Sequence, residues 1–536
     1  MKRYLKIIHF LIVICAIAIY LTGCRGDKEG ASGRNAYIQS DTGEPGTVTY
    51  PLSADGSIKF KYWAQIQGTV LPFISNYSRH PVYQEIQKQT GVSLDFIHPT
   101  SGQEVNQFNL MIASGDLADL MQNAHHYPGG ITKGYEDGAF VDLTPYLKEY
   151  APDYYRLINS NPIVQKQVYL NGKVIAFYKM TFLDHAIPYI RPVIHNDWLK
   201  EFGMEIPETY DDWEMYFKNI QNKKPGVQPM FINFNSGEVQ NLWTGAFDFV
   251  SGWYVVNGKI MHIANAPRYR DFLAKMSEWY EKGYLSRDVS LTTQQVYALF
   301  DAGKLGGYCE TVDNAFSRST ANPAFVPVSA PNPRLHKGQK LHTGIPNWPV
   351  DPGISMTTVI SAQCRDIKNA MRFLNFAYTE HGSNIYNYGI EGLSWTLENG
   401  TPRFTDFMMN NSEKTVAELN NIYRVHIAPK LCEPDTNAHL SIVKLPGARD
   451  FRLRWSDDPD IDDSYRLLTG VIPPAQLEEY NSIMADINAY IGEMKMKFIV
   501  GAEPLYNYDA YLKRLDSLKL ERAREIQQAV YDKMWK

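Results

Sequence analysis

PVYQEIQKQTGVSLDF, residues 81–96, contains a helix, a turn and a strand in one short segment. Pro81 fits the first turn of a helix, and two apolar residues four positions apart follow it before Gly91, a residue type that commonly ends helices. Beyond Gly91 every second residue is apolar, which is the period of a strand with one buried face. The segment therefore predicts a helix that leads directly into a strand.

The segments on either side extend this alternation. Residues 58–62 (IKFKY) have the period of a strand, and apolar residues between 105 and 112 recur at helical spacing up to Gly115. ADLM at 118–121 predicts a third strand. Strands that alternate with helices indicate an α/β fold with a mostly parallel sheet and helices on both faces. Ligands of such folds bind beyond the carboxyl ends of the strands.

The same pattern starts again later in the chain. RPVIHN at 191–196 predicts a strand, and KLGGYC at 304–309 predicts another. Thr209, followed three residues later by Asp212, has the spacing of a capping box and predicts the start of a helix that turns Trp213 inward. The restart favours a second α/β unit.

The first 23 residues have the features of a signal peptide. A basic start precedes an uncharged apolar run at 7–20, which is shorter than the ~20 residues needed to span a bilayer. LTGC at 21–24 resembles the lipobox of bacterial lipoproteins. We therefore expect cleavage after residue 23 and lipidation of Cys24, palmitate included, so that the protein is anchored on the extracytoplasmic face of the cell membrane.

Residues 24–57 join this anchor to the folded part. They are rich in Gly, Ser, Asp and Thr and are nearly free of aliphatic periodicity. We expect a flexible tether that spans roughly 30 Å root-mean-square.

The remaining chain, roughly 480 residues, is too long for one hydrophobic core and long enough for two domains. Amphipathic patterns at 475–498 and 518–535 predict long C-terminal helices. The formal net charge of −5 gives no indication of a nucleic-acid partner. Aromatic residues make up 13% of the chain, which is high and fits a protein that presents rings to a ligand.

Three cysteines, Cys309, Cys364 and Cys432, lie beyond the signal and the lipidated residue. Their odd number and the lack of a CxxC spacing predict buried thiols with at most one disulfide.

Several segments, taken in order, resemble the family 1 extracellular solute-binding proteins of ABC importers. The likeness is to lipoproteins of the oligosaccharide-uptake type and to alginate-oligosaccharide- and maltose-binding proteins, and it extends over nearly all of the mature chain. No single motif is decisive, but the ordered set is. The segments are NQFNLMIASGDLADL (106–120), GAFVDLTPYLKEYAPDY (138–154), NGKVIAFY (171–178), VIHNDWLKEFGMEIPETYDDW (193–213), YGIEGLSWTLENG (388–400) and the tail from 497 to 533.

The resemblance implies a two-lobed periplasmic-binding-protein-like fold (type II) with a hinge and extra C-terminal helices. The chain would first cross between lobes near Phe177 and Tyr178 and return near 345–360. The expected lobes are 58–177 with about 350–405, and 178–349 with about 406–536.

The function implied by the resemblance is binding, not catalysis. The protein would capture a carbohydrate, in particular an oligosaccharide, in a cleft between the lobes and deliver it to the permease subunits of an ABC transporter. No cofactor and no metal would be needed, and the protein is expected to be a monomer.

The resemblance also implies polar ligand contacts. Asn123 and His126, in the loop after ADLM, lie where maltose-binding relatives contact sugar. Glu310 and Asp313, in the turn after KLGGYC, match the corresponding site of the second lobe. Relatives have a Trp in that turn, whereas this chain has Val312 and Asp313, so the identity of the sugar does not transfer.

Carbohydrates also need flat apolar faces for their C–H surfaces. Trp198, Trp213 and Trp279 lie in amphipathic helical patterns and are expected in the core. Five other tryptophans lie in segments rich in Gly, Asn or Pro and are candidate ligand contacts: Trp63, Trp243, Trp253, Trp348 and Trp395.

Two other classes of function stay open from the residues alone. Glu310 and Asp313 could be the carboxylate pair of a polysaccharide hydrolase, although the sequence has no GxSxG or HExxH motif. A lyase is a further enzymatic alternative, and a peptide could replace the sugar as ligand.

Metal binding is not expected from the sequence. The adjacent His125 and His126 would point in different directions, which disfavours a shared metal. The alginate-binding relatives carry a calcium loop, but the corresponding stretch here, residues 218–229, has no carboxylate. The Asp-rich stretch 457–464 is interpreted as a solvated turn that starts a helix, with a cation site left open.

Overall fold

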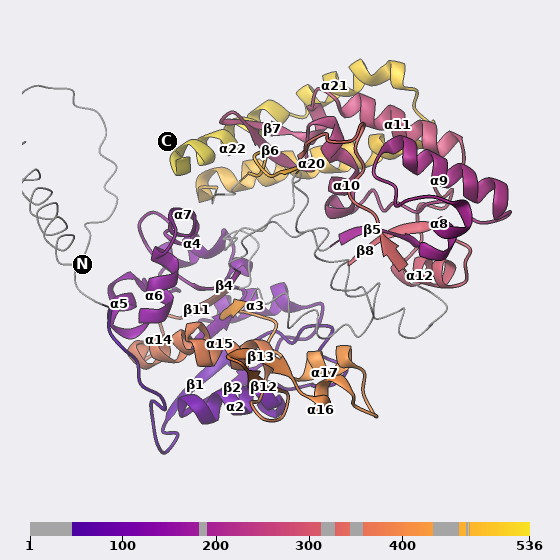
Figure 1. Cartoon of the computed structure of the whole chain (residues 1–536). Helices are drawn as coiled ribbons and strands as arrows, with labels where there is room; N and C mark the ends of the chain where they lie inside the picture. The colour runs from indigo at the N-terminus through magenta and orange to yellow at the C-terminus, as the bar shows by residue number, and fades with distance from the viewer. Residues whose placement is uncertain are drawn as a thin grey trace, which may run out of the picture. The chain divides into compact units, whose positions relative to one another are not determined.

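The computed structural model describes residues 45–181, 190–311, 327–342, 357–432, 460–467, 470 and 472–535 (Figure 1). Cys24, Asp313 and Trp348 lie outside these residues. Residues 81–96 fold as predicted, with α2 at Pro81–Thr90 and β2 at Val92–Ile97. Gly91 between them has φ 68°, and a Cβ there would lie 2.1 Å from the Ser53 carbonyl oxygen, so both the backbone angle and the close approach require glycine.

The first sheet has the strand order β14-β4-β11-β3-β1-β2. β1 pairs in parallel with β2 and β3, and β14 pairs in parallel with β4, whereas β11 runs antiparallel to both of its neighbours. The prediction of a mostly parallel sheet is therefore confirmed here. Besides β2, the strands are β1 (Ile58–Trp63), β3 (Leu120–Gln122), β4 (Phe177–Thr181), β11 (Thr357–Ile360) and β14 (Lys430–Cys432).

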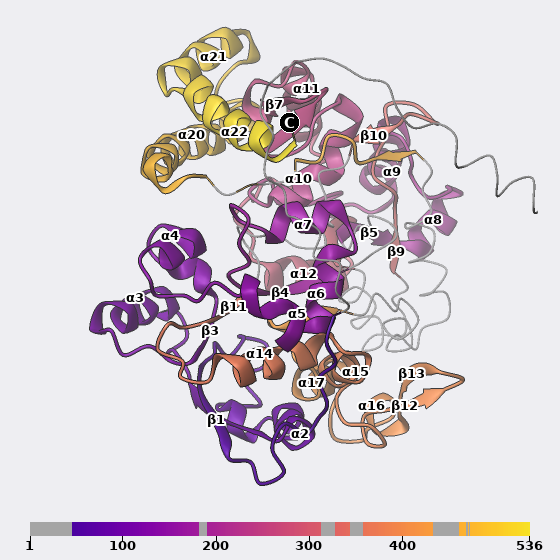
Figure 2. The same cartoon turned by 90° about the vertical axis from the view of Figure 1, so that its left-hand side faces the viewer.

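Helices from two distant parts of the chain surround this sheet. They are α2, α3 (Glu104–Ser114), α4 (Gly130–Glu136), α5 (Leu147–Tyr150), α6 (Pro152–Asn159), α7 (Pro162–Val168), α14 (Ile367–Asn375), α15 (Glu380–Tyr388), α16 (Asp406–Met409) and α17 (Val416–Ile422). A hairpin of β12 (Trp395–Glu398) and β13 (Thr401–Phe404) projects beside α16 and α17 (Figure 2). In α3, Phe108 is fully buried but Val105 is 48% exposed, so the predicted apolar face of this helix is only partly buried.

The N-terminal boundary of the folded part differs from the prediction. Gly46 and Leu52 donate backbone hydrogen bonds to Lys148 and Thr90, at 3.0 and 2.7 Å. The Tyr50 hydroxyl donates to the Arg372 carbonyl at 2.7 Å. Residues 46–52 are thus packed on the first lobe, and the expected tether of 24–57 is too long at its C-terminal end.

The second sheet has the order β8-β5-β9, and both pairings are antiparallel. The described part of this sheet therefore differs from the first sheet, whose pairings are mostly parallel. The sheet and the elements around it are β5 (Ile190–His195), β8 (Gly307–Thr311), β9 (Pro327–Ser329), the hairpin β6 (Trp253–Val256) and β7 (Lys259–His262), the pair β10 (Leu341–His342) and β15 (Ile461–Asp462), and helices α8 (Asn196–Phe202), α9 (Tyr210–Lys223), α10 (Gly237–Thr244), α11 (Tyr269–Glu281) and α12 (Thr293–Asp301).

Three C-terminal helices lie against α11 and the β6–β7 hairpin (Figure 1). They are α20 (Pro474–Val500), α21 (Tyr508–Ser517) and α22 (Leu520–Trp535). α20 and α22 confirm the predicted amphipathic helices, and α21 is a further helix that was not predicted from the sequence.

Two separate hydrophobic cores define two α/β lobes. One core contains residues from Phe60 to Met180 and from Val359 to Ile427, and the other contains residues from Ile194 to Leu341 and from Ile483 to Ala523. The first lobe thus includes 406–432, because β14 pairs with β4 in the first sheet. The expected boundary near residue 405 is replaced by one after Cys432.

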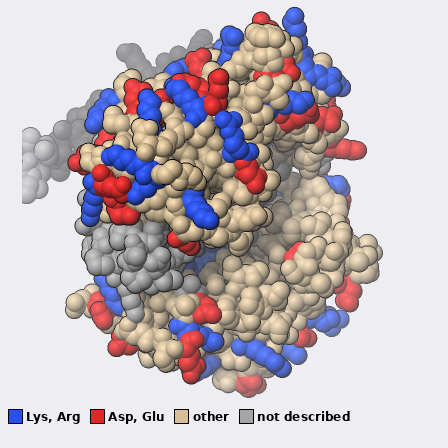
Figure 3. Space-filling model, turned by 90° about the vertical axis from the view of Figure 1, so that its right-hand side faces the viewer, with Lys and Arg blue, Asp and Glu red and all other residues tan. Residues whose placement is uncertain are grey.

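On the face shown in Figure 3, basic and acidic side chains are interspersed. Among the described helices, none combines the length and the apolar character needed to cross a bilayer.

Cys309, Cys364 and Cys432 are free thiols, and burial raises the pKa of Cys309 to about 12.

Candidate functional site

Five strands of the first sheet end at the same edge. β11 runs antiparallel to β3 and to β4, so β4 and its partner β14 have the direction of β1, β2 and β3. The carboxyl ends of these strands therefore lie together, at the position where α/β folds bind ligands. Two described stretches of the first lobe also end here, at Thr181 of β4 and at Cys432 of β14.

A polar cluster occupies this edge. Asn123, directly after β3, has a left-handed backbone (φ 57°) and donates its backbone N–H to the Thr357 carbonyl at 2.8 Å. Its side-chain amide donates to Gln65 Oε1 at 2.8 Å, and Gln65 Nε2 donates to Glu104 Oε1 at 3.1 Å. The chain of amides ends at the first residue of α3, so the loops after β1 and β3 and the start of α3 are held together.

His126 completes the polar cluster. Its ring lies edge-on to Phe108, with ring centroids 6.0 Å apart. Burial lowers the pKa of His126, an effect that the nearby Glu104 carboxylate opposes. Backbone N–H groups of Glu104 and Gly102 lower the pKa of that carboxyl, so the cluster combines a neutral imidazole with a carboxylate at neutral pH. Planar amide, carboxylate and imidazole groups together can bind several hydroxyls.

The structure places Asn123 and His126, for which the resemblance implies ligand contacts, in one cluster with Gln65 and Glu104. The sequence signal that could have identified these two residues is their position just beyond a strand end and at a helix start. Trp63 is the last residue of β1 but is only 6% exposed, and its ring packs edge-on to Phe108 at 6.2 Å.

In the second lobe, Glu310 lies in β8 opposite Arg191 of β5. It is 8% exposed and accepts a hydrogen bond from the Tyr297 hydroxyl. Arg191 is buried and donates to Asn332 Oδ1. Glu310 is thus part of a buried polar network at the end of the second sheet, and its predicted partner Asp313 lies outside the described residues.

The remaining tryptophans divide into core and surface rings. Trp243 lies on α10 with no exposed surface, 5.3 Å from the Trp213 ring centroid and 5.7 Å from that of Trp279. Trp395 is 1% exposed and donates from Nε1 to the Gly389 carbonyl at 3.1 Å. Neither ring has a face open to a sugar in this structure, so the prediction of ligand contacts at Trp243 and Trp395 is not supported.

Trp253 has a partly exposed ring in a different environment. It begins β6, and its Nε1 donates to the Tyr480 hydroxyl of α20 at 2.8 Å. The indole thus helps to attach the C-terminal helices to the β6–β7 hairpin. This contact gives Trp253 a structural role, and its role toward a ligand stays a proposal.

Metal ligands do not converge in the described part of the chain. No group of three or more His, Cys, Asp or Glu side chains there could hold a metal ion. The described end of the Asp-rich stretch is strand β15 rather than the start of a helix, and Asp463 pairs with Arg466 at 3.0 Å.

A surface pocket of about 420 Å³ lies away from this edge, between the N-terminal segment and the end of α2. Its lining residues include Tyr50, Lys88 and Phe376. It is wide open, and the polar cluster of Asn123 does not contribute to it. We therefore locate the candidate site at the carboxyl edge of the first sheet.

Comparison with known proteins identifies the class. The family model of bacterial extracellular solute-binding proteins matches residues 76–382, more than half of the chain. This chain belongs to that family. The family expected from the ordered sequence segments is thereby confirmed.

Individual relatives are distant. Lipoprotein LipO of Bacillus subtilis (strain 168) is 23% identical over 385 residues, covering 67% of this chain and 72% of LipO. The fructooligosaccharide ABC transporter substrate-binding protein FusA of Streptococcus pneumoniae serotype 4 (strain ATCC BAA-334 / TIGR4) is 21% identical over 548 residues, covering 97% of each chain.

A solved structure confirms the fold. The crystal structure of the alginate-binding protein AlgQ2 without calcium ion matches with a TM-score of 0.70 at 20% identity, over 89% of this chain and 98% of AlgQ2. The two-lobed α/β architecture predicted from the sequence is therefore shared with a solute-binding protein.

Proposed function

We propose that this protein captures an oligosaccharide outside the cell and delivers it to the permease subunits of an ABC importer. The observation that carries the proposal is the polar cluster of Gln65, Glu104, Asn123 and His126 at the carboxyl edge of a solute-binding fold. Sugar hydroxyls both donate and accept hydrogen bonds, and this cluster offers amide donors, amide acceptors and a carboxylate. Two relatives, FusA and AlgQ2, are named for fructooligosaccharide and alginate binding.

A glycan screen tests this function. Thermal-shift measurements with a panel of oligosaccharides should give stabilisation by at least one glycan, since a ligand that binds only the folded state raises its stability. A parallel panel of short peptides should give none. Stabilisation by peptides alone, or release of reducing ends from a glycan during incubation, would contradict the proposal and favour a peptide-binding protein or an enzyme.

Glu104→Gln locates the site once a glycan has been found. The variant keeps the shape of the side chain but removes the charge, and loss of a charged hydrogen bond costs about 1.5–3 kcal/mol. We expect roughly ten- to a hundred-fold weaker binding in calorimetry, with a nearly unchanged melting temperature. Glu85→Gln on α2 of the same lobe is the matched control and should bind normally. Equal affinities of both variants would move the site elsewhere.

The lipid anchor at Cys24 is also a proposal. It is supported by LTGC at the end of the apolar run and by the lipoprotein LipO among the relatives. Cys24→Ser should no longer incorporate a palmitate analogue and should be lost from the washed membrane fraction, because the acyl chains supply the attachment. Cys15→Ser, a change inside the apolar run, is the control and should stay labelled and membrane-bound. Continued labelling of Cys24→Ser would show that the anchor assignment is wrong.

A further inference from the structure

The loop after β1 carries one member of the polar cluster, Gln65. Its half-buried side chain joins Asn123 on one side to Glu104 on the other. Because both neighbours bind the same amide, the placement of this amide decides how the cluster faces a ligand. The backbone that carries Gln65 has already left the sheet, since β1 ends at Trp63. The position of Gln65 therefore depends on contacts from other elements.

Tyr77 holds this loop from one side. Its hydroxyl donates to the Gln65 carbonyl oxygen at 3.1 Å. Tyr77 begins the short helix η1 (Tyr77–Arg79), and its ring centroid lies 4.9 Å from that of Tyr83 and 5.8 Å from that of Phe96. The residue is only 3% exposed. The core thus sets the position of the ring, and Tyr77 has almost no surface that a ligand could contact.

His98 holds the neighbouring carbonyl. It follows β2 directly, and its Nδ1 donates to the Ala64 carbonyl oxygen at 2.7 Å. Its Nε2 accepts the Tyr77 backbone N–H at 3.0 Å. These two partners require the neutral tautomer with the proton on Nδ1. Burial lowers the pKa of His98, although the bond to Ala64 opposes this effect, so the ring stays neutral at physiological pH. One imidazole therefore links the loop to Tyr77.

The hydrogen bonds on this loop lie close together. Ala64 and Gln65 are consecutive, and each of their carbonyls accepts from a different side chain. The Ala64 N–H also donates to the Ile97 carbonyl at 3.0 Å. The backbone at these two residues is therefore strongly restricted. A binding group that is already ordered loses less conformational freedom when a ligand binds, so a restricted loop favours affinity.

We propose that Tyr77 and His98 are positioning residues of the binding site, which hold the backbone of Ala64 and Gln65 so that the Gln65 amide meets the sugar hydroxyls in its binding geometry. This inference rests on the proposed function and adds residues that act through Gln65. A loop released from one of these bonds would have to be ordered again at each binding event. The expected loss of affinity is about three- to tenfold, less than for the removal of a direct contact.

Tyr77→Phe tests the first residue. The variant keeps the ring and its packing and removes only the hydroxyl. Calorimetry uses the tightest-binding glycan of the thermal-shift panel, in which maltotriose, cellotriose, xylotriose and kestose are included. We expect the dissociation constant to rise about three- to tenfold.

Tyr154→Phe is the matched control for this variant. The Tyr154 hydroxyl is buried in the same lobe and also donates to a backbone carbonyl, that of Ala176, at 2.8 Å. Both changes remove one buried hydrogen bond of the same kind, so both should lower the stability of the lobe by similar amounts. Tyr154→Phe should nevertheless bind the glycan like the wild type.

A double-mutant cycle separates positioning from general packing. If Tyr77 acts through Gln65, Gln65→Ala should bind weakly, and the addition of Tyr77→Phe should weaken binding no further. The double variant should still be less stable than Gln65→Ala in chemical denaturation, because the bond to the backbone carbonyl is lost as well. Additive losses of affinity would show that Tyr77 influences binding by another route, and the positioning role would be wrong.

His98→Asn and His98→Leu test the second residue. The Asn amide can replace Nδ1 as the donor to the Ala64 carbonyl, whereas Leu has no donor. We expect His98→Asn to bind the same glycan at least about threefold more tightly than His98→Leu. Equal affinities would show that His98 contributes packing alone.

The outcomes separate this inference from the proposed function. In the ligand-free protein, amide hydrogen exchange over residues 64–67 should be faster in Tyr77→Phe than in the wild type and in Tyr154→Phe, because the loop opens more often. Unchanged exchange would contradict the positioning role. If the wild type binds a glycan and Tyr77→Phe binds it equally well, the positioning role is wrong and the proposed function stands. If the wild type binds none of the glycans, the proposed function fails together with this inference.

Discussion

His262 is buried in the second lobe and accepts a hydrogen bond through Nδ1 from the Ala264 backbone N–H at 3.2 Å. This bond caps the short helical turn at Ile263–Asn265. Burial lowers the pKa of His262 to about 3, so the imidazole is neutral in the folded protein at physiological pH. Protonation would both charge a buried ring and remove the acceptor of the cap.

The pH dependence of stability follows from this shift. The unfolded histidine has a pKa of about 6.5, so the stability that His262 contributes is complete above that pH and is lost as the pH falls toward the folded value. His262→Asn keeps a side chain that can accept the capping hydrogen bond but removes the imidazole that titrates. Between pH 6.5 and 5, the free energy of unfolding of the wild type should fall more steeply than that of the variant, and the difference in slope should approach about 1.4 kcal/mol per pH unit toward pH 5.

Denaturant unfolding at a series of pH values measures both slopes. His336→Asn, a change at an exposed histidine, should leave the wild-type slope unaltered. Parallel profiles of wild type and His262→Asn would show that the ring is protonated in the folded state.

For single residues, the sequence predicts which side chains are buried better than it predicts which side chains contact a ligand. Trp213 was expected in the core from its helical pattern, and it is fully buried. Trp243 was misassigned because glycines flank its segment, although Val239, Leu242 and Trp243 have helical spacing after the N-cap Ser236. Whether a ring faces a core or a ligand depends on what packs against it from elsewhere in the chain, and local spacing does not contain that information.

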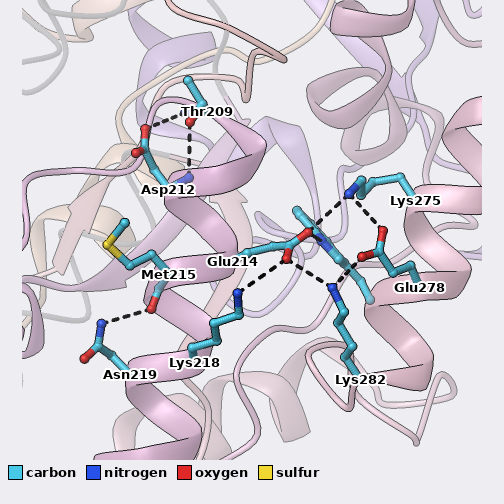
Figure 4. A network of polar contacts seen from close by, with 10 residues as sticks. Thr209, Asp212, Glu214, Met215, Lys218, Asn219, Lys275, Glu278 and Lys282 are labelled. Carbon is cyan, nitrogen blue, oxygen red and sulfur yellow. Dashed lines mark hydrogen bonds and ion pairs between the residues drawn. The ribbon is translucent and has the colours of Figure 1, made fainter.

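Between elements, a charged network joins α9 to α11 (Figure 4). The Glu214 carboxylate of α9 accepts hydrogen bonds from Lys275, Lys282 and the Trp279 indole at 3.2, 3.2 and 3.1 Å. Burial opposes its charge, but the bonds from Trp279 and the two lysines lower its pKa overall. Glu278 shares the same two lysines from the solvent side, at 2.8 Å from Lys275.

Glu214→Gln should destabilise the second lobe. The amide can still accept the indole N–H but leaves two partly buried lysines without their inner counter-charge, and removing one partner of a buried hydrogen-bonded group costs about 1–3 kcal/mol. Glu278→Gln is the matched control. This variant removes the more exposed of the two carboxylates that pair with these lysines. It should lower the free energy of unfolding by less than about 1 kcal/mol.

Chemical denaturation of the two variants provides the measurement. If Glu278→Gln lowered the free energy of unfolding as much as Glu214→Gln, the network would act through surface charge alone. Ligand binding should be the same in both variants, because neither residue is among the candidate ligand contacts.

Element prediction succeeded where local chemistry is sufficient. The capping box of Thr209 and Asp212 starts α9 as expected, with the Thr209 side chain accepting from the Asp212 backbone. The direction of β8 and β9 relative to β5 was not predictable, because alternation of apolar residues is the same in parallel and antiparallel strands. α21 was missed because the GAEPLYNY segment before it reads as a loop and hides the start of the helix.

For the whole molecule, the sequence predicted two lobes and the interruption of the first lobe by the second. It did not predict that residues 406–432 belong to the first lobe. That assignment depends on the pairing of β14 with β4, two strands about 250 residues apart along the chain. It also depends on the hydrogen bonds that Lys430 donates to the carbonyls of Tyr386 on α15 and of Val425 in the segment before β14. Long-range pairing of a three-residue strand leaves almost no signal in a single sequence.

Closure of the two lobes around a ligand is the largest-scale prediction. Candidate contacts come from Asn123 and His126 in one lobe and from Glu310 in the other, so a ligand that touches both should favour a closed form over an open one. Shifting the ratio of closed to open form from about 1:99 to 99:1 requires a ligand that binds the closed form about 5.5 kcal/mol more tightly than the open form. A ligand with a micromolar dissociation constant has about 8 kcal/mol available, which is sufficient.

Small-angle scattering with and without a saturating glycan measures this closure. The radius of gyration should fall on ligand addition for the wild type. In Glu310→Gln, which loses the contact of the second lobe, binding should weaken and the decrease should be smaller at equal saturation, because less of the binding energy depends on closure. In Glu104→Gln, affinity should drop while the contact in the second lobe, and with it compaction at saturation, is preserved. An unchanged radius of gyration for the saturated wild type would show that the ligand contacts one lobe only, and Glu310 would then have no part in the site.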